Sequence, residues 1–403
     1  MPERGRGRAR LALTDARRIL AVQALRAFAY GLGSVLIGVT LARRGLSGAE
    51  VGGVLGALLG GIGLMSLVLA RYGDRIGRRR AYVGLLVLMG PAGAVFAFTG
   101  WLPALILAAL TGTVSTDAVE SGPITSLEQA MLPHATDRDP TRLFGLYNTV
   151  ATLAGALGAL AAGGPTLLHT GSSRWLLAYP VAAVLAVPVA LSLSRAVDRG
   201  DELEAAPPLH RSRGIVYRLA ALFALDSFGG GFVVQAFIAY WFSRKFGTST
   251  ATLGVVFFFV AILQALSFQA AVRLAERIGL LRTMVFTHFP SNVLLALIPF
   301  MPSQGWAIAM LLARFALSQM DVPTRQAYVV GVVDPSERTA AAATTNTARY
   351  VTRPVGPLLA APLAQIALGI PFVVAGAMKC VYDLGLYFMF RRVRLGPSDG
   401  SRP

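Results

Sequence analysis

The stretch RYGDRIGRRR, residues 71–80, recurs in altered form as RLAERIGLLR, residues 273–282. The copies begin 202 positions apart, which is about half of the 403 residues in the chain. They share an acidic residue followed by the same tripeptide, as Asp74, Arg75, Ile76 and Gly77 and as Glu276, Arg277, Ile278 and Gly279. Repetition at a fixed period is the signature of an architecture built from duplicated units. The sequence therefore predicts two halves of similar fold in parallel orientation.

Apolar segments flank both copies and make up most of the chain. Of all residues, 55% are hydrophobic and 14% are charged, so the polar groups are too few to cover a soluble globule. A transmembrane helix needs about 20 consecutive apolar residues. Windows without Asp, Glu, Lys or Arg reach this length at residues 51–70, 81–116, 143–173, 175–194, 246–272 and 283–313. We therefore expect an integral membrane protein.

Turn-like clusters at residues 100–103 and 301–305 divide two of these windows, and further apolar segments carry only one or two charges. The predicted helices occupy residues 19–41, 50–70, 81–100, 103–131, 143–167, 175–195, 216–243, 250–272, 282–301, 305–332, 340–368 and 370–391. The predicted fold class is an all-α integral membrane protein of about twelve transmembrane helices in two parallel-repeat six-helix halves. The halves are residues 1–195 and 216–403, and a polar cytoplasmic linker, residues 196–215, joins them.

The formal net charge of +17 comes from arginines placed by membrane topology rather than by nucleic-acid binding. Basic residues gather before the first predicted helix, after the second and after the twelfth, which lie on one side of the membrane. Because loops rich in Lys and Arg stay in the cytoplasm, we expect both termini there. Four basic residues oppose this bias, Arg43, Arg44, Arg244 and Lys245. The apolar run from Ile19 is too long for a signal peptide and is predicted to be a retained first helix.

Residues 70–79 resemble the loop signature after the second helix of the major facilitator superfamily, Gly-x-Leu-Ala-Asp-Arg-x-Gly-Arg-Arg. The chain keeps Asp74, Arg75, Gly77, Arg78 and Arg79, and it departs on the helix side at Ala70, Tyr72 and Gly73. The twelve spans, the parallel repeat and the central linker extend the resemblance over nearly the whole chain. The resemblance implies a secondary transporter that works by alternating access.

Charges in the repeated loop form a candidate gate. An acid at a cytoplasmic helix end, followed by arginines, can pair with neighbouring helix ends and hold one face of a bundle shut. The alternative is a plain cytoplasmic anchor of positive charge. Because the motif recurs in both halves, we favour gating. The candidates are Asp74, Arg75, Gly77, Arg78, Glu276, Arg277 and Gly279.

Ionisable residues inside the predicted helices indicate a polar path. Facing lipid, each would cost roughly 2.5 to 3.5 kcal/mol near the bilayer centre, so they must face one another or an aqueous cavity. Spacings of three or four residues place pairs on one helix face: Asp117 with Glu120, Asp321 with Arg325, Arg349 with Arg353, and Lys379 with Asp383. We interpret the last as a structural ion pair. In the first pair, Asp117 and Glu120, the repulsion between two neighbouring carboxylates favours proton uptake by one of them, as a proton carrier requires.

In the superfamily, the helices that correspond to the first, fourth, seventh and tenth line the central cavity. The resemblance therefore implies that charges on these helices line a water-filled path. The candidates for the substrate or proton path are Arg26, Asp117, Glu120, Asp226, Asp321, Arg325, Asn346, Arg349 and Arg353. Arg314, on the tenth predicted helix, either joins this set or braces helix packing.

Two features predict irregular helices beside these charges. Asp226 is followed by the glycine run 229–231, which either breaks the helix and exposes carbonyls to a ligand or permits close helix packing. We favour the break. Pro323 removes one backbone donor and predicts a bend near Gln319, beside the pair of Asp321 and Arg325.

The sequence favours a secondary active transporter that moves a small solute, is coupled to protons and works in export. Helix-5 residues resemble the glycine-proline signature of the antiporter branch of the superfamily: Gly155, Gly158, Gly163, Gly164 and Pro165. Their order and spacing differ from that signature, and the helix-4 arginine motif of the branch is absent. One alternative is an uptake symporter of the same fold. The other is an integral membrane enzyme. The only feature that favours an enzyme is the spacing of His134 and Asp139, in which an Asp could orient a His that acts as a base.

We expect no enzymatic activity, cofactor or metal, because the four histidines are isolated in sequence and Cys380 is the single cysteine. The expected partners are a small-molecule substrate, a coupling proton and the lipid bilayer, and the protein is expected to be a monomer. Its expected location is the inner or plasma membrane, crossed many times. Cations and anions in the predicted path nearly balance, so the charge of the substrate does not follow.

Overall fold

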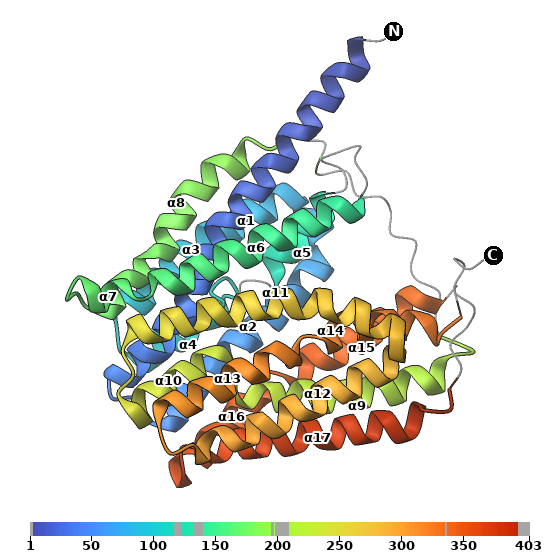
Figure 1. Cartoon of the computed structure of the whole chain (residues 1–403). Helices are drawn as coiled ribbons and strands as arrows, with labels where there is room; N and C mark the ends of the chain where they lie inside the picture. The colour runs from blue at the N-terminus through green and yellow to red at the C-terminus, as the bar shows by residue number, and fades with distance from the viewer. Residues whose placement is uncertain are drawn as a thin grey trace. The chain divides into compact units, whose positions relative to one another are not determined.

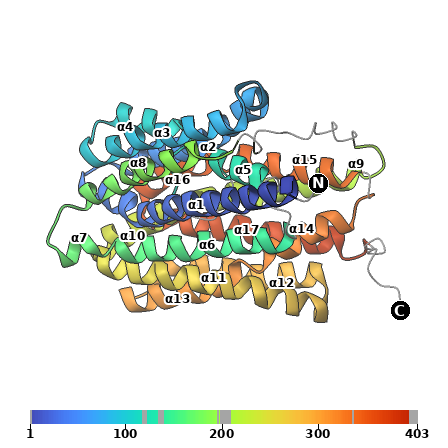
Figure 2. The ribbon, with the colours of Figure 1, turned by 90° about the horizontal axis from the view of Figure 1, so that it is seen from above.

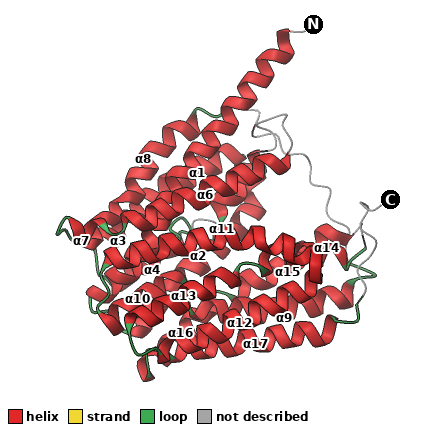
Figure 3. Ribbon diagram, viewed as in Figure 1, coloured by secondary structure: helices red, strands yellow, loops and turns green. Residues whose placement is uncertain are grey.

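The computed structural model describes residues 3–116, 122–132, 140–194, 197, 209–334 and 337–393. Within these ranges every regular element is a helix, as Figure 3 shows. Nine helices of the described chain are long and apolar enough to cross a membrane. They span Asp15–Arg43, Gly48–Leu69, Arg78–Phe98, Leu146–Leu167, Ser172–Leu191, Arg213–Phe246, Thr250–Ile278, Leu280–Phe300 and Ile370–Phe390. The predicted all-helical membrane fold is confirmed.

The other three predicted spans are interrupted helices. The span 103–131 contains α4 (Leu102–Leu110) and α5 (Pro123–Met131), with the backbone between them not helical at residues 113–115. The span 305–332 is divided into α13 (Gln304–Ser318) and α14 (Asp321–Gly331). The span 340–368 is divided into α15 (Arg338–Thr352) and α16 (Val355–Ile366). Each piece is too short to cross a bilayer alone.

The chain separates into two compact units, each described by itself. Unit 1 is Met1–Glu202 with Gln235–Ala261, and unit 2 is Leu203–Val234 with Ile262–Pro403. Unit 1 therefore contains α10 (Gln235–Phe246) and the start of α11 (Thr250–Ile278). The boundaries at residues 195 and 216 that the sequence predicts for the two halves stay a prediction.

In unit 1, α1 (Glu3–Arg43) packs along α6 (Pro140–Ala161), and both views in Figures 1 and 2 place these helices side by side. A Cβ on Gly31 of α1 would overlap the carbonyl oxygen of Gly155, and a Cβ on Gly158 would overlap that of Phe28. Glycines thus let the two backbones approach closely, as small residues do in membrane bundles. The remaining helices are α2 (Gly48–Ile76), α3 (Arg78–Phe98), α7 (Gly164–Leu167), the 3₁₀ helix η2 (Ser172–Leu177) and α8 (Ala178–Leu191).

In unit 2, α9 (Arg213–Phe232) packs against α15, and α12 (Leu280–Leu297) packs against α17 (Ile370–Phe390). A short 3₁₀ helix, η4 (Ile298–Phe300), extends α12. The contact pattern repeats that of unit 1, where α1 packs against α6 and α3 against α8. Side chains from α9, α12, α14 and α17 form one apolar core, which includes Phe223, Met284, Tyr328 and Leu386. The duplication predicted from the loops therefore extends to the packing of the helices.

The repeated loops have the same backbone geometry. Gly77 ends α2 with φ 88°, and Gly279 lies between α11 and α12 with φ 87°. The N–H of each glycine donates to the carbonyl four residues earlier, Gly73 or Ala275, at 2.9 Å. Each glycine is also the residue just before the next helix, α3 or α12. Glycine adopts this positive φ without the steric cost that a Cβ brings.

Large apolar side chains remain exposed on several helices. Leu67 of α2 is 63% exposed, Val184 of α8 is 71% exposed and Phe388 of α17 is 61% exposed. In water such surfaces would favour aggregation, whereas lipid tails solvate them. The exposure agrees with a protein whose solvent is the bilayer.

Candidate functional site

A buried network of charges in unit 2 centres on Asp226 of α9. Lys379 Nζ of α17 lies 2.5 Å from Asp226 Oδ1, and Arg325 of α14 lies 3.6 Å from Oδ2. His288 Nε2 of α12 lies 3.8 Å from Oδ1. All four residues are buried. Three helices thus bring basic groups to one carboxylate that α9 supplies.

The network continues beyond both sides of Asp226. His288 Nδ1 lies 2.9 Å from Asp383 Oδ1, and the amide of Asn292 donates to Asp383 Oδ2 at 2.9 Å. On the other side, Arg325 donates to Asp321 Oδ2 at 2.7 Å. The chain of contacts therefore runs from Asp321 through Arg325, Asp226 and His288 to Asp383.

Local sequence explains how these side chains reach one another. A Cβ on Gly229 or Gly230 would lie 3.3 or 3.6 Å from the nearest atom of Lys379, so these glycines leave room for the lysine chain beside Asp226. Pro323 lies in the first turn of α14, and the chain bends between Ser318 and Asp321 as predicted. The hydroxyl of Thr324 donates to the carbonyls of Met320 and Asp321, which compensates backbone groups at the bend.

One sequence-based interpretation in this region is wrong. Lys379 and Asp383, four residues apart on α17, do not pair with each other: Lys379 binds Asp226, and Asp383 binds His288 and Asn292. Partners on neighbouring helices offset the charges better than the next turn of the same helix. The predicted span 216–243 does break next to the glycine run 229–231: α9 ends at Phe232 and α10 begins at Gln235, with residues 233 and 234 not helical. A Cβ on Gly231 would also overlap the carbonyl of Arg353, so the run serves close packing of helices as well.

His288 is a functional candidate that the sequence did not predict, because it is isolated from the other histidines along the chain. His288 and Asn292 are one helical turn apart in the predicted span 282–301, and both are buried. Polar residues that share one face of an apolar helix tend to have partners inside the bundle. That spacing was the available signal, but the partner Asp383 lies 95 positions away in sequence.

A second buried ion pair lies in unit 1. Arg26 of α1 donates to both carboxylate oxygens of Glu128 of α5, at 2.6 and 3.4 Å. The hydroxyls of Tyr82 and Tyr147 donate to the same carboxylate at 2.9 and 2.5 Å. Gln23, one turn before Arg26, accepts a further hydrogen bond from the guanidinium. Arg26 was a predicted candidate, but Glu128 was missed although it lies inside the predicted span 103–131.

The ion pairs of the two units occupy corresponding positions with opposite charge. Arg26 and Asp226 are 200 positions apart, and Glu128 and Arg325 are 197 positions apart. These offsets are close to the 202 positions that separate the repeated loops. The basic partner is therefore on the first helix of unit 1 but on the interrupted α13–α14 helix of unit 2.

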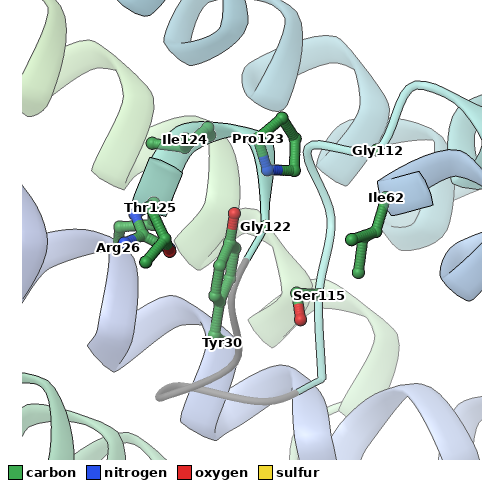
Figure 4. A pocket seen from close by; sticks show the side chains of 9 residues that line it. All are labelled: Arg26, Tyr30, Ile62, Gly112, Ser115, Gly122, Pro123, Ile124 and Thr125. Atoms are coloured by element: carbon green, nitrogen blue, oxygen red, sulfur yellow. The ribbon is translucent and has the colours of Figure 1, made fainter. Parts of the chain in front are cut away.

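A small pocket lies beside Arg26, where the span 103–131 is interrupted. Figure 4 shows Arg26 and Tyr30 of α1 on one side of it and Ile62 of α2 on the other. The hydroxyl of Tyr30 donates to the carbonyl of Thr113 at 2.8 Å, and that of Tyr179 donates to the carbonyl of Ser115 at 2.6 Å. Tyrosine hydroxyls thus satisfy carbonyls that a continuous helix would have paired. Irregular backbone of this kind in a membrane protein occurs where it is buried or lines a cavity.

The remaining predicted path residues have varied surroundings. Asp117 and Glu120 lie outside the described residues. Arg349 and Arg353 are partly buried on and just after α15, and Asn346 is exposed. The carbonyl of Arg349 accepts a hydrogen bond from the hydroxyl of Ser227, the residue after Asp226, at 2.8 Å. The structure thus brings Asp226, Asp321, Arg325 and Arg349 together in unit 2, while Arg26 belongs to the separate pair in unit 1.

The loop candidates for gating fall into two groups. Arg78 donates to the carbonyl of Ala130 near the end of α5 at 3.3 Å, and Arg79 binds the carbonyl of Leu191 at the end of α8. These arginines bind the carbonyl ends of helices within unit 1. Arg75, Glu276 and Arg277 are exposed, and none of them forms an ion pair with another described side chain. The side chain of Asp74 lies outside what the structure describes.

Comparison with known proteins identifies the class. Residues 19–357 match the family model of the Major Facilitator Superfamily. The yeast membrane protein YJR124C of Saccharomyces cerevisiae is 26% identical over 420 aligned positions, which cover 93% of this chain and 94% of the yeast protein. The chain belongs to the Major Facilitator Superfamily, and it is a membrane transporter rather than an enzyme.

Solved structures share the fold. A point variant of the nucleoside transporter NupG superposes with a TM-score of 0.77 at 12% identity, covering 93% of this chain and 99% of that one. A D-xylose-proton symporter superposes with a TM-score of 0.69 at 14% identity, covering 94% and 98%. The protein is a multi-pass secondary transporter of small solutes.

Proposed function

We propose that this transporter is driven by protons, and that His288 with its carboxylate neighbours Asp226 and Asp383 carries the coupling proton. The observation that supports this proposal is the position of His288, which is buried between two carboxylates that contact its two ring nitrogens. Histidine is the side chain whose unperturbed pKa lies in the range where physiological pH differences act. Protonation of His288 would strengthen its contacts to both acids.

A proton that enters this network changes the balance of contacts around Asp226. Lys379, Arg325 and His288 all contact the carboxylate of Asp226. A stronger contact from one of these groups therefore weakens the contacts of the other two. These groups lie on different helices, which gives proton binding a means to alter helix packing. The charged and titratable groups that surround the site are Arg314, Asp321, Arg325, Arg349, Lys379, Tyr382 and Asp383.

We propose export as the direction, in exchange for protons, with both termini in the cytoplasm. The glycines and proline from Gly155 to Pro165 support this, because they resemble the antiporter branch in composition, although their order and spacing differ from its signature. The fold is shared with a D-xylose-proton symporter, so proton coupling occurs within this architecture. Uptake with protons is the alternative, and a gradient experiment separates the two directions.

The test uses the full chain in proteoliposomes that contain a pH-sensitive dye. A thermal-shift screen of metabolites and drugs supplies the transported solute. We expect wild type to move this solute against its gradient when a proton gradient is imposed, with proton flow opposite to solute flow. His288→Gln and Asp383→Asn should lose gradient-driven transport and retain solute exchange in the absence of a gradient. Orientation is read with an impermeant thiol reagent on Lys245→Cys in a Cys380→Ser background, and we expect labelling from outside.

Two controls make the result decisive. The variant His210→Gln changes a histidine outside the predicted spans and should leave coupling unchanged. The double variant Asp117→Asn with Glu120→Gln tests the carboxylate pair that the sequence alone suggested. If that double variant loses coupling while His288→Gln retains it, the assignment to His288 is wrong. Proton flow in the same direction as the solute would overturn export.

A further inference from the structure

Arg314 of α13 is a buried cation with unpaired donors. It is 8% exposed, and its Nε and Nη1 atoms are buried without a hydrogen-bond partner. Its guanidinium stacks 4.6 Å from the ring centre of Phe315. A ring face attracts the cation but accepts no hydrogen bond as strong as that of an oxyanion. Buried polar groups are nearly always paired, so this group calls for an explanation.

Neighbouring side chains repeat the same feature. Ser318 follows Arg314 by four residues and therefore lies on the same face of α13, and its hydroxyl is buried and unpaired. The Nε atom of Arg349 on α15 is also buried without a partner. The carbonyl of Arg349 accepts a hydrogen bond from Ser227, the residue after Asp226, and the carbonyl of Arg314 accepts one from Ser291, one turn after His288. The carboxylate of Asp226 is instead contacted by Lys379, Arg325 and His288.

The charges near Asp226 leave a positive excess. The described basic groups there are Arg314, Arg325, Arg349 and Lys379, and the carboxylates are Asp226, Asp321 and Asp383. With His288 neutral the excess is one positive charge, and protonation of His288 increases it. An excess of cations in a low dielectric is unfavourable unless an anion joins them.

We infer that Arg314, Ser318 and Arg349 bind an oxyanion, a carboxylate or phosphate group, of the transported solute. A guanidinium matches such a group in a planar, two-bond geometry, and a serine hydroxyl adds a further donor. This inference rests on the proposed transport function and assigns its substrate class as organic anions. The negative group would cancel the positive excess and occupy the unused donors at once.

Anion binding can be measured on the purified full chain without any gradient, so its failure is distinct from failure of proton coupling. Thermal unfolding is recorded in detergent with potassium phosphate, potassium citrate, D-glucose or potassium chloride, salts being compared at equal ionic strength. We expect phosphate or citrate to raise the unfolding temperature above the chloride value and D-glucose to have no effect. Arg314→Gln should weaken the apparent affinity about tenfold or more, in line with loss of one charge-assisted contact.

Further variants keep the inference testable if Arg314→Gln fails to fold. Ser318→Ala and Arg314→Lys each remove part of the donor set and should each weaken anion binding. Arg392→Gln changes an exposed arginine after α17 and should leave it unchanged. The inference fails if neither anion stabilises wild type, or if Arg314→Lys and Ser318→Ala bind as wild type does. Nanodiscs of phosphatidylcholine and phosphatidylglycerol separate the two sources of an oxyanion. Stabilisation by phosphatidylglycerol without any by the soluble anions would overturn the assignment to a solute.

Discussion

Glu337 illustrates how one residue joins two elements. It immediately precedes α15, and its carboxylate accepts backbone N–H bonds from His210, Arg211 and Ser212 at 2.6, 2.9 and 2.8 Å. Those residues lie just before α9, so Glu337 connects the entry to α9 with the start of α15. Hydrogen bonds from the Ser212 side chain and from these backbone N–H groups lower the pKa of Glu337 from 4.5 to about 2.

The lowered pKa predicts an acid-dependent contribution to stability. Because the folded state holds the carboxylate ionised, the contribution is complete above about pH 4.5 and is lost as pH falls toward about 2. We expect Glu337→Gln to lower the unfolding temperature at pH 7, and the difference from wild type to shrink between pH 4.5 and pH 2. Thermal unfolding in detergent at pH 7, 5 and 3 measures this.

Glu276→Gln is the matched control for this prediction. Glu276 is exposed and forms no ion pair with another described side chain, so its replacement should not change the unfolding temperature. A constant difference between Glu337→Gln and wild type across the three pH values would contradict the ionised anchor.

At the scale of elements, the interrupted helices carry the polar chemistry. Asp321 is the first residue of α14, and Arg325 lies one turn later, so the bend before Asp321 directly adjoins the pair. Arg325 also reaches Asp226 on α9, which links the bend to the centre of the network. Movement at the bend would therefore change two ion contacts together.

Paired substitutions separate a structural role of this ion pair from a mechanistic one. Asp321→Asn or Arg325→Gln alone strands a buried charge, and we expect each to cost about 3 to 5 kcal/mol of stability and to abolish transport. The double variant should recover folding, because no charge of the pair remains unmatched. We expect transport to stay lost in the double variant, as measured by solute exchange in proteoliposomes.

Recovery of both folding and transport in the double variant would show that the pair is only structural. Because Arg325 also contacts Asp226, the control Arg325→Lys keeps a positive charge beside both carboxylates and should retain folding. The single variant Asp321→Glu keeps the negative charge but changes the length of the side chain, and it should retain folding. It therefore separates the effect of charge from the effect of side-chain geometry.

At the scale of the whole molecule, duplication is visible in the loops, in the helix contacts and in the two buried ion pairs. Gly77 and Gly279 adopt the same backbone conformation. The charges of Arg26 with Glu128 and of Asp226 with Arg325 are reversed between the units, so the duplicated frame has been kept while the chemistry diverged. The unit 1 pair is enclosed by tyrosine hydroxyls, whereas Asp226 is shared by several cations.

Gating by the repeated loop is the prediction at this scale. Arg75 and Arg277 are exposed, with no described ion-pair partner, so their charges are available to another state of the transporter. We propose that Arg75→Ala and Arg277→Ala leave the protein folded but change the transport rate and the accessibility of engineered cysteines on either side. Exchange assays and thiol labelling provide the two measurements.

Arg80→Ala is the control for gating, since Arg80 is exposed in the first turn of α3 and lies outside the four-residue motif of residues 74–77. Unchanged transport and labelling in both motif variants would support the alternative, a plain anchor of positive charge. An effect of equal size in Arg80→Ala would show that total loop charge, and not the motif, matters.

The sequence by itself determined the membrane fold, the duplication and the interruption near Pro323. These follow from composition and from short-range rules: apolar length, a repeated motif and the missing donor of proline. It also placed Arg26, Asp226, Asp321 and Arg325 inside the membrane, because a charge in an apolar segment is visible without any partner.

Only the tertiary structure decided which charges meet. Spacing along one helix favoured Lys379 with Asp383, but Lys379 contacts Asp226, 153 positions away. His288 looked isolated until helix packing placed it between acids from α9 and α17, and Glu128 became notable only through Arg26 and two tyrosines. A charge buried in a membrane protein is stabilised by whichever opposite charge packing brings near. That choice depends on distances between helices that are far apart in sequence, which local patterns do not encode.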